Sequence, residues 1–243
     1  MFARQMRAAF HAIREAITPT LTLSQLGKLT PEEFVIAGSS LVRAYPSFSW
    51  TSDGANKSYL PPERQYLVMR NVACRSRASD SKGEFTESAE GEWNAVAPNS
   101  TETYDDLDNY SDPAINEVAA SDAGVDRAVS AVRLYDMYLV YDTYYACPRV
   151  YLVGRHFNGH PLAPDEMMQD VYQDYAEKTA TLERHPFFPD LLTISVHPCR
   201  HVQTMKRIME QMNITSIENY MPAFLKMMAS MLPTMEYDYT NSI

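Results

Sequence analysis

RLYDMYLVYDTYYACPRVYLVGR, residues 133–155, is the stretch that decides the fold of this chain. It holds two runs, 133–145 and 149–155, that are rich in tyrosine, valine and leucine, and residues of this kind favour β-strands. The link between the runs is short and contains Pro148. The run YLVMRNV at 66–72 predicts another strand ahead of them. Together these runs predict an antiparallel sheet at the centre of the protein.

Helical patterns lie on both sides of these strands. Residues 30–33 read Thr-Pro-Glu-Glu, a capping box with proline at the first helical position, and they predict a helix start. Further helices are expected at 165–175, directly after Cys199, and at 221–232, with a short extended segment at 191–196. Helices packed on an antiparallel sheet define an α+β fold.

An acidic segment interrupts the pattern. Residues 80–126 hold thirteen Asp and Glu residues and one Lys, a net charge of −12, which leaves +2 for the rest of a chain whose net charge is −10. A segment this polar buries too little apolar area to offset its ordering entropy. We therefore expect a flexible acidic insert at 76–130 between two parts of one folded core, 19–75 and 131–243. The near-neutral core gives no support for nucleic-acid binding, which requires a basic face.

The segment 1–18 predicts an amphipathic helix. Its apolar side chains fall on one face and its basic side chains on the other. The apolar face comprises Phe2, Met6, Phe10, Ile13 and Ile17. Three interpretations remain open: packing on the core, a mitochondrial presequence, or a helix that lies in a membrane surface.

The three cysteines are Cys74, Cys147 and Cys199. Their odd number and the absence of a CxxC pair argue against a disulfide framework or a zinc ribbon. No apolar run is long enough to span a bilayer, and the first ten residues lack the apolar block of a secretory signal. We expect a cytoplasmic protein whose thiols are reduced.

SVHPCRH, residues 195–201, is the strongest chemical signal in the chain. It places Cys199 between an extended segment and a helix, where the positive helix end and nearby cations favour a thiolate. His197, Arg200 and His201 are expected to surround the thiol with hydrogen-bond donors. A thiolate at such a position can accept and pass on an acyl group by thioester exchange.

Three other interpretations of Cys199 stay open on the residues alone. A free cysteine is most often a buried core residue. A metal site would use the alternation of His197, Cys199 and His201, but no clear fourth ligand follows. A Cys–His hydrolase would need a histidine base and an oxyanion hole.

Motifs along nearly the whole chain resemble the autophagy-related protein 3 family of ubiquitin-conjugating-type enzymes. The matching stretches are LTPEEFVIAGSSLV (29–42), YLPPERQYLVMRNVACRSR (59–77), GEW (91–93), YDMYLVYDTYY (135–145), PRVYLVG (148–154), QDVYQDYAEKTATLERHPF (169–187), SVHPCRH (195–201) and FLKMMASMLPTMEYDYT (224–240). The order of YDxYY, HPC and EYDYT is highly specific.

This resemblance implies a ubiquitin-conjugating core with an N-terminal helix and a flexible insert. It implies that Cys199 accepts autophagy-related protein 8 from the activating enzyme, autophagy-related protein 7, and transfers it to phosphatidylethanolamine at a membrane. A further candidate partner is the conjugate of autophagy-related proteins 12 and 5. No cofactor or metal is implied, and the protein would associate reversibly with the membrane surface.

The resemblance also implies roles for residues near the thioester. Tyr144, Tyr145, Thr179, Pro198 and His201 match family positions expected to position the thioester and the amine or to stabilise the oxyanion. The alternative interpretation is a pair of core aromatics, a helix-end threonine and a turn proline.

The chain departs from its relatives in three places. Its insert is shorter, Tyr175 stands where some relatives have a histidine, and 212–220 lacks a WxxL-type cargo motif. The stretch from Tyr104 to Leu107, with acidic flanks, could replace that motif by adding a strand to a ubiquitin-like sheet, or it could be a plain acidic run. A second functional hypothesis is a catalytically silent adaptor that binds ubiquitin-like proteins and membranes.

Overall fold

The structure is a computed structural model that describes residues 27–78, 132–171 and 179–236. Several predicted features lie outside these ranges: the N-terminal helix, nearly all of the acidic insert with the Tyr104–Leu107 motif, and Tyr175. Within the described residues, the predicted helices and strands occur in the expected order, and the structure adds strands at 48–51, 180–184 and 235–236 that the sequence analysis did not predict.

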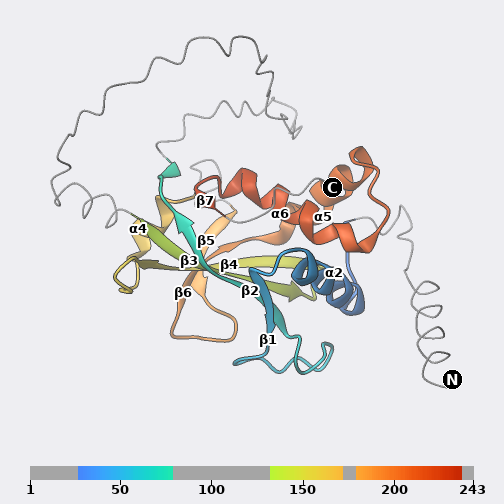
Figure 1. Ribbon diagram of the computed structural model, residues 1–243, viewed down its shortest axis with the longest axis horizontal. Helices are drawn as coiled ribbons and strands as arrows, with labels where there is room; N and C mark the ends of the chain where they lie inside the picture. Colours follow the sequence, from blue (N-terminus) through green and yellow to red (C-terminus); the bar gives the residue numbers. More distant parts are fainter. Residues whose placement is uncertain (1–26, 79–131, 172–178, 237–243) are drawn as a thin grey trace, which may run out of the picture.

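The centre of the molecule is an antiparallel sheet (Figure 1). Its strands are β1 (Phe48–Thr51), β2 (Tyr66–Cys74), β3 (Arg133–Asp142), β4 (Cys147–His156), β5 (Ala180–Arg184), β6 (Leu192–Val196) and β7 (Met235–Glu236). The order across the sheet is β1-β2-β3-β4-β6-β5, and β7 pairs with β2. The strands β3 and β4 form its longest hairpin, with Arg133 opposite His156 and Asp142 opposite Cys147.

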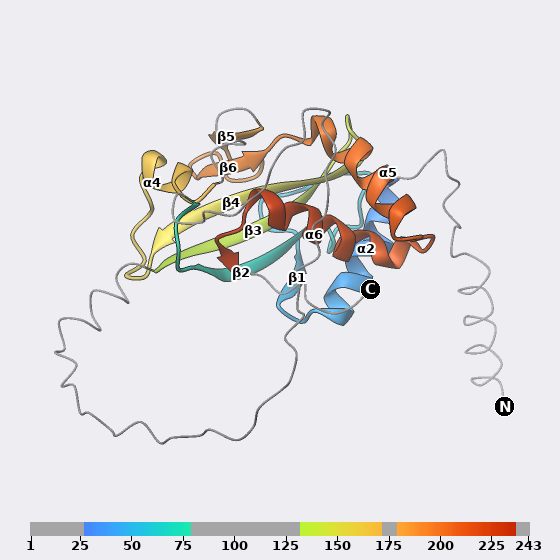
Figure 2. The ribbon, with the colours of Figure 1, turned by 90° about the horizontal axis from the view of Figure 1, so that it is seen from above.

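The longer helices cover one face of this sheet (Figure 2). The helical elements are α2 (Pro31–Ala44), α4 (Pro164–Met168), the 3-10 turns η2 (Pro198–Arg200) and η3 (Ile217–Asn219), α5 (His201–Gln211) and α6 (Tyr220–Met231). The predicted capping box is confirmed at α2: the Glu33 N–H donates to Thr30 Oγ1 at 3.2 Å, and the Thr30 N–H donates to Glu33 Oε2 at 2.8 Å. The α+β fold is confirmed.

Side chains of β3 alternate between two apolar clusters, as expected for a strand buried on both faces. Tyr135, Met137 and Leu139 belong to the main core, which includes buried residues of α2, α5 and α6. Tyr138 and Val140 belong to a smaller cluster on the opposite face. That cluster also contains Tyr66, Val68 and Tyr151, with Phe187 and Phe188 packed against it.

Three predicted boundaries are wrong. The strand expected at 133–145 ends at Asp142, and residues 143–146 form the turn before β4. The helix expected at 165–175 ends at Met168, and residues 169–171 form a turn and bend. The turn places the Asp170 carboxylate where it contacts Arg77 and Arg133 in a buried network. A helix that continued past Met168 would move Asp170 away from these contacts. Pro148 lies inside β4 rather than in the link before it. Proline is tolerated there because β4 pairs with β6 only at Tyr151 and Leu152, so one side of β4 is unpaired near Pro148.

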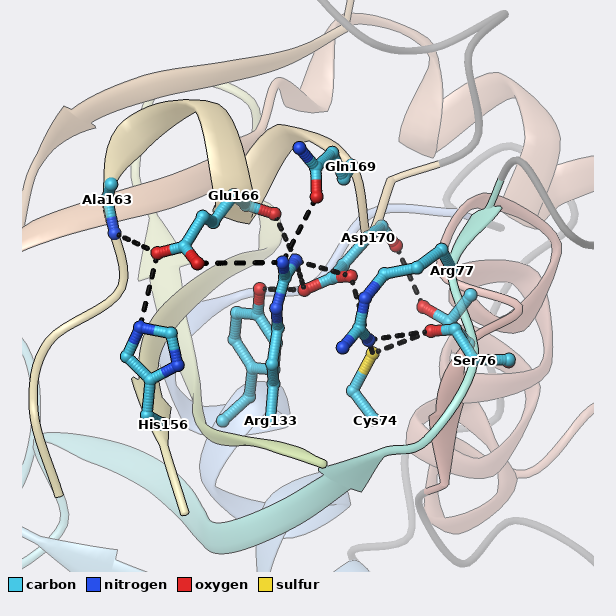
Figure 3. A network of polar contacts seen from close by, with 11 residues as sticks. Cys74, Ser76, Arg77, Arg133, His156, Ala163, Glu166, Gln169 and Asp170 are labelled. Carbon is cyan, nitrogen blue, oxygen red and sulfur yellow. Dashed lines mark hydrogen bonds and ion pairs between the residues drawn. The ribbon is translucent and has the colours of Figure 1, made fainter. Parts of the chain in front are cut away.

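A network of polar contacts around Asp170 joins Arg77, near the start of the predicted insert, to Arg133, directly after it (Figure 3). The Asp170 side chain is fully buried and lies 2.9 Å from Arg133 Nη1 and 3.3 Å from Arg77 Nη1. The Tyr135 hydroxyl donates to the same carboxylate at 2.6 Å. Ala78, inside the predicted insert, is buried beside them. Because Arg133 is the first residue of β3 and Asp142 the last, this network lies at the far end of the strand from the β3–β4 turn.

Candidate active site

Cys199 lies where β6 gives way to α5. The strand ends at Val196, and His197 caps the turn η2 that contains Cys199 and leads directly into α5. Cys199 is exposed, whereas Cys74 and Cys147 are buried. Burial raises the pKa of Cys74 to about 11 and that of Cys147 to about 12, so both remain protonated thiols at neutral pH. Exposure alone therefore separates Cys199 from the other two cysteines.

His197 joins Cys199 to the start of β5. Its N–H donates to the Thr179 carbonyl at 2.6 Å, which extends the β5–β6 ladder by one step. Its Nδ1 accepts the Cys199 N–H at 3.2 Å. With Nδ1 occupied as an acceptor, a neutral imidazole carries its proton on Nε2 and presents a donor there. Thr179 also has a buried Oγ1 with no hydrogen-bond partner among the described residues.

The β3–β4 turn brings the predicted tyrosines to the same place. The Asp142 carboxylate accepts the N–H groups of Tyr144 and Tyr145 at 2.9 and 3.0 Å, and this holds the turn closed. The Tyr145 ring lies 5.4 Å from the His197 ring, edge to face. Partial desolvation raises the pKa of Tyr145, and charge on Tyr144 and Cys199 raises it further. The structure thus brings Tyr145, His197 and Cys199 together.

Tyr144 projects into solvent. It is 86% exposed, and its ring packs on the edge of Tyr145 at 4.8 Å. An aromatic side chain this exposed contributes little to the core, so the interpretation of Tyr144 as a core aromatic is wrong. It is free to contact a bound molecule beside the thiol.

His201 does not lie beside the thiol as a donor, contrary to the expectation from the sequence. Its side chain is 1% exposed and packs edge to face on Phe224 at 5.6 Å. The reason is helix phase: His201, Met205 and Met209 recur every four residues and form the buried stripe of α5. Burial lowers the pKa of His201 to about 4, so the ring is neutral. Pro198 is also buried, beneath the turn.

The metal interpretation requires His197, Cys199 and His201 on one face of a strand. The strand ends before all three, and His201 points into the core while Cys199 is exposed.

In the part of the chain that the structure describes, no helix is long and apolar enough to cross a bilayer.

Asp142 was missed by the sequence analysis. Its role as the acceptor that closes the β3–β4 turn has a sequence signal, because aspartate commonly accepts backbone N–H groups two and three residues ahead in a turn. The sequence around it, YDTYY, predicts a role for the tyrosine rings but not for the aspartate that accepts the tyrosine N–H groups.

An antiparallel sheet with helices on one face, and an exposed cysteine beside His197 and Tyr145, fit a ubiquitin-conjugating-enzyme-like core. Comparison with known proteins makes the class specific. Residues 33–239 match the family model described as autophagocytosis associated protein, active-site domain.

Full-length relatives agree with this match. The chain is 34% identical to autophagy-related protein 3 of Arabidopsis thaliana over 99% of this chain and 96% of the relative. It is 32% identical to that of Yarrowia lipolytica, over 98% and 78% respectively, and 28% identical to that of Saccharomyces cerevisiae, over 97% and 98%. The chain belongs to the autophagy-related protein 3 family. It is a conjugating-enzyme-like member of the autophagy machinery with an active-site domain.

Proposed function

We propose that this protein carries autophagy-related protein 8 as a thioester on Cys199 and transfers it to the amine of phosphatidylethanolamine. The observation that carries the proposal is the exposure of Cys199, alone among the three cysteines, at a strand-to-helix turn lined by His197, Tyr145 and Thr179.

The reaction has two acyl transfers. In the first, the Cys199 thiolate attacks the carbonyl of the thioester that links the cargo's C-terminus to the activating enzyme. A new C–S bond to Cys199 forms, and the thiolate of the activating enzyme's cysteine leaves. In the second, the neutral amine of the headgroup attacks the Cys199 thioester, a C–N bond forms, and the Cys199 thiolate leaves. The amine then loses its extra proton to water. Neither transfer requires a metal or a redox cofactor.

Each neighbouring residue has a role in this proposal. The Nε2–H of His197 is a donor for the carbonyl oxygen, on which negative charge develops in the tetrahedral intermediate. Tyr145 borders the same space through its contact with the His197 ring, and the buried Thr179 hydroxyl has no hydrogen-bond partner among the described residues. The exposed ring of Tyr144 covers the cargo's C-terminal tail. Pro198 and His201 fix the turn and the start of α5 from below, as positioning residues.

Partners follow from the same proposal. Autophagy-related protein 7 loads Cys199, and the conjugate of autophagy-related proteins 12 and 5 promotes the transfer. The helix expected at 1–18, through Phe2, Met6, Phe10, Ile13 and Ile17, brings the loaded enzyme to the bilayer. An anchor of this kind raises the effective concentration of the headgroup near the thioester without changing the chemistry at the thiol. Tyr104 and Leu107 in the acidic insert bind the cargo.

A charging assay tests the proposal. Wild-type protein is mixed with autophagy-related protein 7, autophagy-related protein 8 and ATP, and the products are run on a non-reducing gel. Cys199→Ser should trap an oxyester that resists reductant, whereas Cys74→Ser and Cys147→Ser should leave the reducible adduct. A reducible adduct on Cys199→Ala would contradict the assignment of the thiol. Absence of any adduct on the wild type would favour the adaptor hypothesis.

The cargo motif is tested separately. The double variant Tyr104→Ala, Leu107→Ala should weaken binding of autophagy-related protein 8 in calorimetry while Cys199 still charges at high cargo concentration. Unchanged affinity would make the acidic stretch a plain charged run.

A further inference from the structure

Arg149 makes polar contacts with three separate strands. Its Nε donates to Ser195 Oγ in β6 at 2.8 Å, and its Nη2 donates to Glu183 Oε1 in β5 at 2.5 Å. Its Nη1 lies 4.0 Å from the second carboxylate oxygen of Asp142, at the end of β3. The guanidinium also stacks over the Tyr151 ring at 5.1 Å.

Every group proposed to surround the thioester leaves the sheet from one of these three strands. Asp142 holds the turn with Tyr144 and Tyr145. Glu183 lies on β5, four residues after Thr179, which precedes that strand, and Ser195 lies on β6, two residues before His197, which follows that strand. A single side chain thus contacts the three strands that lead to both tyrosines, the threonine, the histidine and the cysteine.

The direct ladder between the strands is short on this side of the sheet. Strands β4 and β6 pair only at Tyr151 with Ser195 and at Leu152 with Ile194. On the thiol side of this short ladder, the Arg149 guanidinium adds a side-chain connection from β4 to Ser195 of β6. Its side chain is only 17% exposed, so these hydrogen bonds are shielded from solvent more than a surface ion pair is.

We propose that Arg149 is a positioning residue for the transfer step, a proposal that rests on the proposed function of Cys199. It does not touch the reacting atoms. It sets the spacing between the tyrosine turn and the thiol, so that the amine approaches the thioester between groups already in place. The planar fork of arginine can bind Ser195 and Glu183 at once, and a lysine ammonium on a flexible stem cannot keep both at the same angles.

The strand offers a matched control. Arg155 lies on the same strand and the same face, six residues from Arg149, and its Nη1 pairs with the Asp136 carboxylate of β3 at 3.0 Å. It also bonds Asn71 of β2, and its side chain is 26% exposed. Arg155 thus resembles Arg149 in setting and in ion pairing, but its contacts are at the end of β4 away from the thiol.

The experiment scores only loaded enzyme. Arg149→Met, Arg149→Lys and Arg155→Met are charged with autophagy-related protein 8, the activating enzyme is then inactivated, and discharge of the thioester is followed without membranes. Ethanolamine serves as the acceptor that needs the site. Hydroxylamine serves as the reference, because it cleaves thioesters readily without help from a protein. Because both rate constants are measured on the same loaded enzyme, a change in their ratio does not come from a smaller amount of folded or loaded protein.

Arg149→Met should lower the ethanolamine rate constant by about 10- to 100-fold, the loss expected when reacting groups shift by about 1 Å. The hydroxylamine rate should stay within twofold. Arg149→Lys should fall in between, and Arg155→Met should discharge to both amines like the wild type. Equal loss in Arg155→Met, or no loss in Arg149→Met, would overturn the proposal.

A second variant covers failure of Arg149→Met to fold. Ser195→Ala removes one neutral hydroxyl and keeps both ion pairs, and should slow discharge to ethanolamine by about 3- to 10-fold, the value of one hydrogen bond. An unchanged rate in Ser195→Ala would count against the positioning role. If wild-type protein accepts no cargo at all, the proposed function fails, and that result is distinguishable because it appears before any discharge is measured.

Discussion

Asp170→Asn should destabilise the protein strongly while leaving the thiol chemistry in place. The substitution keeps the size of the side chain and removes its charge. Asp170 is fully buried, and the Arg133 side chain that pairs with it at 2.9 Å is 9% exposed. After the change, the guanidinium of Arg133 remains buried, and among the described residues its nearest carboxylate is that of Glu166 at 3.8 Å.

The expected magnitude follows from that burial. Removing one partner of a buried ion pair costs about 3–5 kcal/mol, because the remaining charge is left without compensation. Asparagine still offers an oxygen to the Tyr135 hydroxyl, and Arg133 keeps its bond to the Glu166 carbonyl. We therefore expect a loss of about 3 kcal/mol, out of a total that is about 5–15 kcal/mol for an ordinary domain. In a chain of 243 residues this lowers Tm by about 6–12 °C.

Urea denaturation followed by circular dichroism measures the loss, and Glu236→Gln is the control. Glu236 pairs with Arg75 at 3.0 Å, and the two side chains are 52% and 66% exposed. Exposed pairs contribute about 0–1 kcal/mol, so the control should lose about 1 kcal/mol. Equal losses in the two variants would refute the reasoning from burial. Loss of charging on Cys199 at a temperature where Asp170→Asn is folded would refute the separation of the network from the site.

Three further outcomes are expected. Burial lowers the pKa of both His185 and His201 from 6.5 to about 4, so the unfolded chain binds protons first; stability should be complete above pH 6.5 and fall by about 2 kcal/mol per histidine at pH 5, and a flat urea midpoint from pH 7 to 5 would contradict this. Gly27→Ala should destabilise by about 2 kcal/mol or more, since φ is +96° and a Cβ would lie 2.1 Å from the Val202 carbonyl; an unchanged melting temperature would contradict that contact. Phe10→Asp should leave charging of Cys199 intact but abolish lipid conjugation on small vesicles; normal conjugation would make the N-terminal helix dispensable, and loss of charging would place it in the folded core.

The parts of the fold that the sequence predicts are those fixed by local pattern. Residues 66–72 and 133–155 gave their strands because branched and aromatic residues crowd there. Thr30 and Glu33 gave the start of α2 because a capping box involves residues three apart. The place of Cys199 between a strand and a helix was predictable in the same way, since the proline and the polar residues around it break the strand and begin a helix. Its exposure was not, because the residues alone left a buried core cysteine open.

The rest depends on contacts between distant residues. The Asp170 network joins residues that span more than ninety positions of the chain, namely Arg77, Arg133 and Asp170. No local sequence pattern predicts that the turn after Met168 brings Asp170 to these arginines. His201 was misplaced for a related reason. Its position beside Cys199 in the chain suggested proximity to the thiol, but the phase of α5, set by packing against Phe224, turns the ring into the core. Arg149 could not be singled out from the sequence, because its partners Glu183 and Ser195 lie 34 and 46 positions away along the chain.

Strand β3 explains why stability and catalysis should respond to different substitutions in this protein. Its first residue, Arg133, is held by the Asp170 network, and its last, Asp142, closes the tyrosine turn; Figures 1 and 2 show α4 and α5 at opposite ends of the β3–β4 hairpin. Buried charge gathers at the Arg133 end, where its loss acts on the free energy of unfolding. At the Asp142 end the side chains of Asp142 and Arg149 are 18% and 17% exposed, against 0% and 9% for Asp170 and Arg133, so their loss should cost less stability but shift groups whose spacing would set the proposed transfer rate. A variant at the first end should therefore unfold more easily and still transfer cargo when folded. A variant at the second should remain folded, accept cargo and transfer it slowly.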